Sequence, residues 1–78
     1  MKVTVYMLIQ TDVNMAGPVA AAARELPGVL TADDVTGPYD VILKAEAPSL
    51  DDLGKMVIGK VQQIAGITRT LTCPVISY

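Results

Sequence analysis

The 78-residue sequence predicts a single small α+β domain with the element order β-α-β-β-α-β. Three observations lead to this prediction. Residues 2–10, 29–47 and 67–78 alternate with the period of two that strands show. Residues 16–28 and 49–66 have the apolar spacing of three to four residues that helices show. The turn signal TGPYD, residues 36–40, divides the middle stretch into the two strands of an antiparallel hairpin.

The first strand is apolar on both of its faces. Val5, Met7 and Ile9 alternate on one side, and Tyr6 and Leu8 fall on the other. Since the side chains of both sets are largely apolar, we expect both faces of this strand to be covered.

The first helix is Ala-rich, and alanine has the highest helix propensity. Gly17 and Pro18 suit the N-cap and the first helical position, and the Pro–Gly pair at 27–28 ends the segment. The expected buried stripe consists of Val19, Ala22, Ala23 and Leu26.

The second helix opens with a capping-box pattern, Ser49 and Asp52. We interpret Gly54 and Gly59 as sites of close approach, and Gly66 as the stop signal. The expected buried stripe consists of Leu50, Leu53, Val57, Val61 and Ile64.

Pro74 lies within the last strand, where it cannot donate to a ladder, and an edge position, which the arrangement below gives this strand, tolerates it. Two β-α-β halves packed on one sheet give the ferredoxin-like arrangement, a four-stranded antiparallel sheet with two helices on one face. The other face then carries Tyr6, Leu8, Ile42 and Ile76.

Self-association is the expected way to cover that second face. A domain this small usually needs a disulfide, a metal or oligomerisation for support. The chain has one Cys and no His, and 51% of its residues are hydrophobic while 18% are charged. We therefore expect a two-fold dimer that packs sheet against sheet.

Composition also bears on the function classes. The chain has no His, so it has neither an imidazole base nor an imidazole metal ligand. It also contains neither a P-loop nor a dinucleotide-binding fingerprint. We therefore expect no enzyme activity, no bound metal and no cofactor. The net charge of −2 argues against nucleic acid as a direct partner. No membrane segment or signal peptide is apparent in the sequence. The single cysteine, Cys73, is expected to serve in packing. A chain with one cysteine fits the reducing cytoplasm.

Two places could bind a ligand. In the TGPYD turn, Gly37 can expose backbone N–H groups to a carboxylate, Tyr39 can wall a pocket and Asp40 can accept from an amino group. Equally, Gly37 and Pro38 could be present only because the hairpin turn requires their backbone geometry. Thr68, Thr70 and Thr72 could supply a row of hydroxyls, or could simply be residues with high β propensity.

These residues carry a resemblance to a known family. The stretch GVLTADDVTGPYDVILKAEAPSLDDL, followed by IAGITRTLTCPVI, resembles the RAM domain, the ligand-binding half of the Lrp/AsnC transcription regulators. The resemblance implies dimers joined through their sheets, rings such as octamers or decamers, and amino acids bound between protomers. By match to the motif, it implies that the ligand lies near Gly37, Tyr39, Asp40, Thr70 and Thr72, with Leu30 lining the pocket.

The family's full-length members begin with a helix-turn-helix domain, whereas the first strand here begins at about residue 3. We therefore expect residues 1–78 to form a single stand-alone RAM domain without its own DNA-binding domain. Any influence on transcription would pass through a partner, such as a full-length Lrp/AsnC regulator.

Two alternatives remain open from sequence. Dimeric ferredoxin-like barrels include small monooxygenases and isomerases, although these usually rely on His, Trp or acid pairs. ACT-type regulatory domains share the topology and also bind amino acids, but they commonly join their sheets edge to edge.

Overall fold

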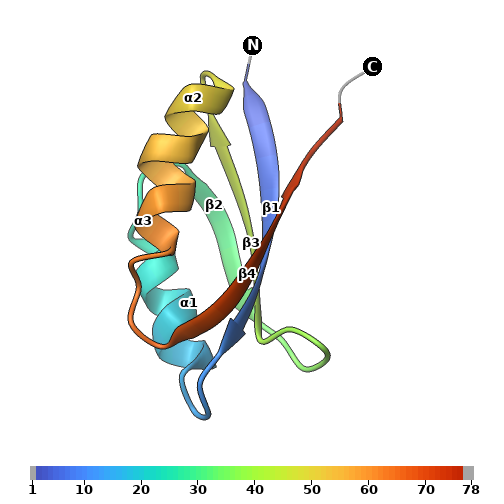
Figure 1. Ribbon diagram of the computed structural model, residues 1–78, viewed down its shortest axis with the longest axis vertical. Helices are drawn as coiled ribbons and strands as arrows, with labels where there is room; N and C mark the ends of the chain where they lie inside the picture. The colour runs from blue at the N-terminus through green and yellow to red at the C-terminus, as the bar shows by residue number, and fades with distance from the viewer. Residues whose placement is uncertain (1, 77–78) are drawn as a thin grey trace.

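Four antiparallel strands form one sheet in the order β2-β3-β1-β4 in the computed structural model, which describes residues 2–76. The strands are β1 (Val3–Thr11), β2 (Val29–Asp34), β3 (Val41–Ala47) and β4 (Ile67–Pro74). Helix α1 (Ala16–Arg24) and a second helical run lie on the same face of the sheet (Figure 1). The predicted ferredoxin-like arrangement is confirmed.

The core lies between the helices and one face of the sheet. Strand β1 occupies a central position, and Val5, Met7 and Ile9 on its inner face are fully buried. The helices and the neighbouring strands bury the remaining core residues around them: Val19, Ala20, Ala23, Ala32, Val41, Leu43, Ala45, Ala47, Leu53, Val57 and Val61. Within residues 2–76, no helix covers the opposite face of the sheet (Figure 1).

Strand β4 is an edge strand, as the ferredoxin-like arrangement predicts. Pro74 lies opposite Val5 at the end of the β1–β4 ladder, and beyond it the Val75 N–H donates to the carbonyl of Thr4 at 2.9 Å. An edge position tolerates proline because one side of the strand needs no ladder donor. The strand was expected to continue to residue 78, but it ends at Pro74, and residues 77–78 lie outside the described part of the chain.

Helix α1 begins two residues earlier than predicted. Met15, not Gly17, is the N-cap, and the Val19 N–H donates to its carbonyl at 2.9 Å. Pro18 is tolerated as the third helical residue because the N–H groups of a first turn have no helical acceptor. The predicted buried stripe was also wrong at one position, since Ala20 is buried and Ala22 is exposed.

The second helical run comprises α2 (Leu50–Asp52), the π-helical segment η1 (Leu53–Ile58) and α3 (Gly59–Val61). The predicted cap is confirmed, because the Asp52 N–H donates to Ser49 Oγ at 3.1 Å. The segment η1 was not predicted, and the Gly59 N–H donates to the carbonyl of Gly54, five residues earlier.

Two expectations for this run were wrong. A Cβ on Gly54 would meet no atom within 4 Å, and one on Gly59 would meet only the Gly54 carbonyl at 3.3 Å, so neither glycine marks a contact with another element. Leu50 lies outside the buried stripe and is exposed to solvent, because the helix turns its side chain away from the sheet.

Gly28 is the glycine that the packing requires. Its φ of +91° is unfavourable for other residues, and a Cβ there would lie 2.8 Å from the carbonyl oxygen of Glu46. The Glu46 N–H also donates to the Gly28 carbonyl at 2.8 Å. The loop from α1 to β2 is thereby held tightly against the end of β3.

We predict that Gly28→Ala lowers the free energy of unfolding by roughly 2–4 kcal/mol, from backbone strain and the steric clash together. Gly17→Ala is the matched control, because a Cβ at that helical position meets nothing within 4 Å. This control should be neutral or stabilising by up to about 1 kcal/mol. Urea unfolding at one protein concentration measures both, and equal effects would refute the close-contact explanation.

Candidate functional site

The uncovered face of the sheet carries a continuous apolar strip. Leu8 of β1 lies opposite Ile42 of β3 on one side and Leu71 of β4 on the other. Tyr6 adjoins them one row along the sheet. Tyr6, Ile42 and Leu71 are 40%, 36% and 37% exposed, and Leu8 is half-buried. We call these four residues the open strip; they form a hydrophobic patch that the single chain leaves in contact with solvent.

Charged residues of both signs surround the open strip. The Lys44 ammonium lies 5.7 Å from the centre of the Tyr6 ring, within the range of a cation–π contact. Asp33 lies opposite Ile42, Glu46 opposite Thr4, and Arg69 opposite Gln10. An apolar centre with a mixed charged rim is the composition of protein–protein interfaces.

Cys73 belongs to the same face and corrects an expectation. It lies opposite Tyr6 and is exposed in the single chain, whereas a packing role was expected. The reason is register: the residues of β4 that are paired with Tyr6 and Leu8 point away from the helices, together with those two side chains.

The loop at 36–40 is fixed to the sheet by its own hydrogen bonds. The Val35 N–H donates to the Asp40 carbonyl at 2.8 Å and closes the turn. Gln10 Nε2 donates to the Pro38 carbonyl at 3.1 Å, so the loop is also joined to β1. Gly37 lies at the exposed tip with a φ of +150°, and open space surrounds it.

Asp40 is the half-buried carboxylate that anchors this loop. Its Oδ2 accepts from the Thr11 N–H at 2.8 Å, and its own N–H donates to the Ile9 carbonyl at 2.8 Å. Its other oxygen, Oδ1, has no hydrogen bond within residues 2–76. Tyr39, the preceding residue, is also half-buried. One carboxylate oxygen of Asp40 therefore stabilises the fold, and the second can accept a hydrogen bond from another group.

The threonines of β4 lie on a different part of the sheet from this loop. Thr70 and Thr72 are opposite Ile9 and Met7, which places them on the helix-side face. No helix packs extensively on β4, so Thr70 is only half-buried and Thr72 is exposed. Thr70 is level with Val41, next to Asp40, but two strand spacings away, about 10 Å.

Thr68 falls at the register shift between β1 and β4. It therefore has no direct partner on β1, while Thr11 is paired with Ile67 and Gln10 with Arg69. The expected regular row of three hydroxyls is reduced to the pair Thr70 and Thr72.

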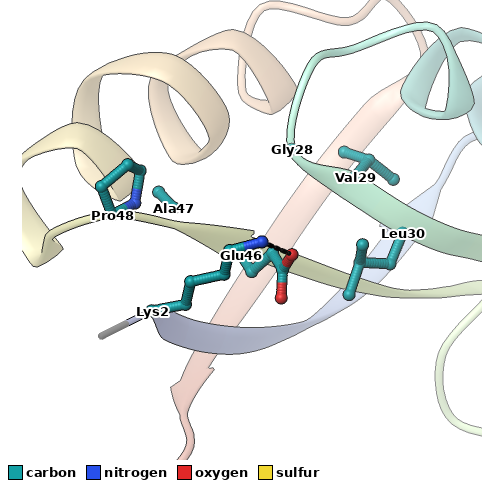
Figure 2. Close-up of a pocket in the computed structure, with 7 residues that line it drawn as sticks. All are labelled: Lys2, Gly28, Val29, Leu30, Glu46, Ala47 and Pro48. Atoms are coloured by element: carbon teal, nitrogen blue, oxygen red, sulfur yellow. Dashed lines mark hydrogen bonds and ion pairs between the residues drawn. The ribbon is translucent and has the colours of Figure 1, made fainter.

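Leu30 lies at the other end of β2 from the loop. It is half exposed and borders a hollow of about 380 Å³ that we call the corner pocket (Figure 2). The remaining wall consists of Lys2, Gly28, Val29, Glu46, Ala47 and Pro48. Sequence reasoning missed this pocket because Lys2 and Glu46 approach only through the register of β1 on β3, which the residue pattern does not specify.

Residues 2–76 show neither a metal site nor a membrane-spanning helix. No group of three or more His, Cys, Asp or Glu side chains in this part of the chain is arranged to hold a metal ion. None of its helices has both the length and the apolar character needed to cross a bilayer.

A family model described as the Lrp/AsnC ligand binding domain matches residues 4–78. The chain belongs to the Lrp/AsnC family. The resemblance seen in the TGPYD and threonine motifs is thus confirmed, and the match favours this family over the ACT domains. The family is one of transcriptional regulators, not of enzymes.

Among curated relatives, an uncharacterized HTH-type transcriptional regulator of Pyrococcus furiosus is 33% identical over 72 residues, which is 88% of this chain. That match spans 48% of the relative, so the Lrp/AsnC domain described here covers about half the length of such proteins.

Solved structures agree on the fold. The protein TTHA0845 of Thermus thermophilus superposes with a TM-score of 0.88 at 28% identity, over 97% of this chain and 95% of that one. AsnC of Escherichia coli superposes with a TM-score of 0.85 at 27% identity, over 97% of this chain and 52% of AsnC. The four-stranded sheet with its helices on one face is therefore the fold of the family.

We predict that Asp40→Ala lowers the free energy of unfolding by about 1–3 kcal/mol, because the Thr11 N–H loses a charged acceptor in a partly buried place. Asp12→Ala, which removes a nearby exposed carboxylate, should change it by less than about 0.5 kcal/mol. Chemical denaturation of the two variants at the same concentration measures the difference. An Asp40 variant as stable as the Asp12 control would show that this hydrogen bond does not anchor the loop.

Proposed function

We propose that this Lrp/AsnC domain is a non-enzymatic module that associates with copies of itself through the open strip and binds an amino acid between protomers. The observation that carries the proposal is the combination of the family match with an apolar sheet face that residues 2–76 leave exposed. Ligand binding would influence transcription through a partner regulator that carries a DNA-binding domain.

Burial of the open strip supports the self-association. Each 400 Å² of apolar surface removed from water contributes about 10 kcal/mol at roughly 25 cal/mol per Å². The entropic costs of association and of ordering side chains offset much of this free energy. A two-fold contact, however, buries the patch of both chains at once. Charges of both signs at the rim let the face meet its own copy without a net repulsion.

The arrangement of the predicted ligand residues supports a site shared between chains. Asp40 offers one unused carboxylate oxygen to an ammonium group, and Tyr39 and Gly37 adjoin it on the same loop. Thr70 is about 10 Å away on the other side of β1 in the same chain, and Thr72 lies two residues farther along β4. In our proposal the hydroxyls that complete the site are therefore supplied by a second protomer, within a closed ring of dimers.

Introducing a charge into the open strip should break the association. We predict that Leu8→Glu lowers the solution mass toward that of one 8.2 kDa chain, because an unpaired carboxylate would be buried at the centre of the contact. Met56→Glu is the control, since Met56 is half exposed on the helical run. Size-exclusion chromatography with light scattering distinguishes the two. Equal masses for Leu8→Glu and the wild type would contradict the proposed interface.

Isothermal titration calorimetry against the common amino acids tests the ligand proposal. We expect at least one to bind and to shift the amide NMR signals of Gly37 and Tyr39. Asp40→Asn should weaken that binding at least tenfold, or about 1.4 kcal/mol, since the ammonium group loses its charged acceptor. Asp12→Asn, an exposed carboxylate nearby, is the control. The absence of any signal across the panel would refute the effector role.

A further inference from the structure

Two exposed apolar surfaces lie at the same end of the sheet but at opposite edges. One is the corner pocket, beside β2 and the end of β3 (Figure 2). The other is the segment 75–76, into which the chain continues from β4 (Figure 1). Because β2 and β4 are three strand spacings apart, about 14 Å, the segment lies too far away to fill the pocket of its own chain.

The segment 75–76 is apolar and held in position at its start. The Val75 N–H donates to the Thr4 carbonyl at 2.9 Å, so the segment continues the line of β4. Pro74 lies opposite Val5 of the buried face, which assigns Val75 to the outer face. Val75 is 44% exposed and Ile76 is 72% exposed. Covering these two side chains would remove apolar surface from water.

The corner pocket has properties that match this segment. Its volume of about 380 Å³ is that of a small ligand site, so an aliphatic side chain can enter it. Leu30 in its wall is 50% exposed. Its two charges neutralise each other, since Lys2 Nζ donates to Glu46 Oε1 at 2.9 Å, as the dashed line in Figure 2 shows. An uncharged segment can therefore cover the pocket without leaving a buried charge unpaired.

The two-fold contact proposed above brings these surfaces together in one of its two orientations. Aligned sheets that pack face to face are related by an axis that runs either along or across their strands. An axis along the strands places β3 over β1 of the second copy, and β2 over β4. It keeps corresponding ends of the two sheets together. The corner pocket of each copy then faces the segment 75–76 of the other.

The residues of the outer face favour the axis along the strands. With this axis, Ile42 lies over Leu8 of the second copy, because the two share a row of the sheet. Lys44 lies over Tyr6 for the same reason. An axis across the strands through the row of Leu8 would instead place Asp33 over its own copy, and like charges repel. Shifted toward the row of Tyr6, it would place the Lys44 ammonium over Ile42, which costs desolvation free energy.

We propose that the segment 75–76 of one copy occupies the corner pocket of the second copy, with Ile76 against Leu30. This inference rests on the proposed association through the open strip, and it adds the orientation of the two chains. Two-fold symmetry gives each dimer two such contacts, one at each edge of the interface. The pocket is therefore an interface site whose occupant is the chain itself.

Engineered cysteines test the contact directly. All variants are full chains that carry Cys73→Ser, which removes the exposed native thiol. The double variant Leu30→Cys/Ile76→Cys should form disulfide-linked dimers under oxidised glutathione, because the Cα atoms of a disulfide lie within about 7 Å. Within one chain the two positions are too far apart to react with each other. The matched control Leu30→Cys/Met56→Cys should give at least tenfold less linked dimer, since Met56 lies on the helical run.

The affinity between the copies provides a second measurement. Ile76→Glu should raise the dissociation constant of the dimer at least tenfold, because its carboxylate would be buried beside Leu30 and near Glu46. Val13→Glu is the control, since Val13 is 87% exposed in the turn between β1 and α1, and it should leave the constant unchanged. Sedimentation velocity over a dilution series measures both variants.

Three results would overturn this inference while leaving a dimer in place. They are the absence of linked dimers in the double variant, an unchanged dissociation constant in Ile76→Glu, and efficient self-linkage of Asp33→Cys, which would indicate the axis across the strands. A wild-type mass of 8.2 kDa at every concentration would instead refute the association through the open strip, and this contact with it.

Discussion

The structure depends on a central strand that is apolar on both faces. The inner face of β1, with Val5, Met7 and Ile9, is buried beneath the helices. Its outer face, with Tyr6 and Leu8, is not covered by any helix of the described residues. One hydrophobic layer thus forms the core of the domain, and the other is left exposed to solvent by residues 2–76. The proposed interface and the proposed ligand site between protomers both follow from that second layer.

Periodicity predicted the elements because each burial pattern is local. The alternation in β1 and β3 and the cap at Ser49 were sufficient for order, type and approximate bounds. The errors arose where several arrangements satisfy the same pattern. An Ala-rich helix can start at Met15 or at Gly17 with similar propensity, and the wider turns of η1 leave the spacing of Leu53, Val57 and Val61 almost unchanged.

The candidate sites depended on register, which sequence patterns determine weakly. The TGPYD loop was recognised because its turn residues are contiguous, and its anchoring through Asp40 adds a structural role to the predicted one. The threonines and Leu30 are distant from it in the same chain because β1 separates β3 from β4 and because Leu30 lies at the far end of β2. The Lys2–Glu46 pair could not be foreseen, since the two residues are 44 positions apart.

The central claim is that the outer face of the sheet is covered by a second copy of the chain. Sedimentation equilibrium of the unaltered protein over a dilution series into the low micromolar range tests it most directly. The account predicts a mass that remains an even multiple of 8.2 kDa across the series. A stable 8.2 kDa particle at every concentration would contradict it.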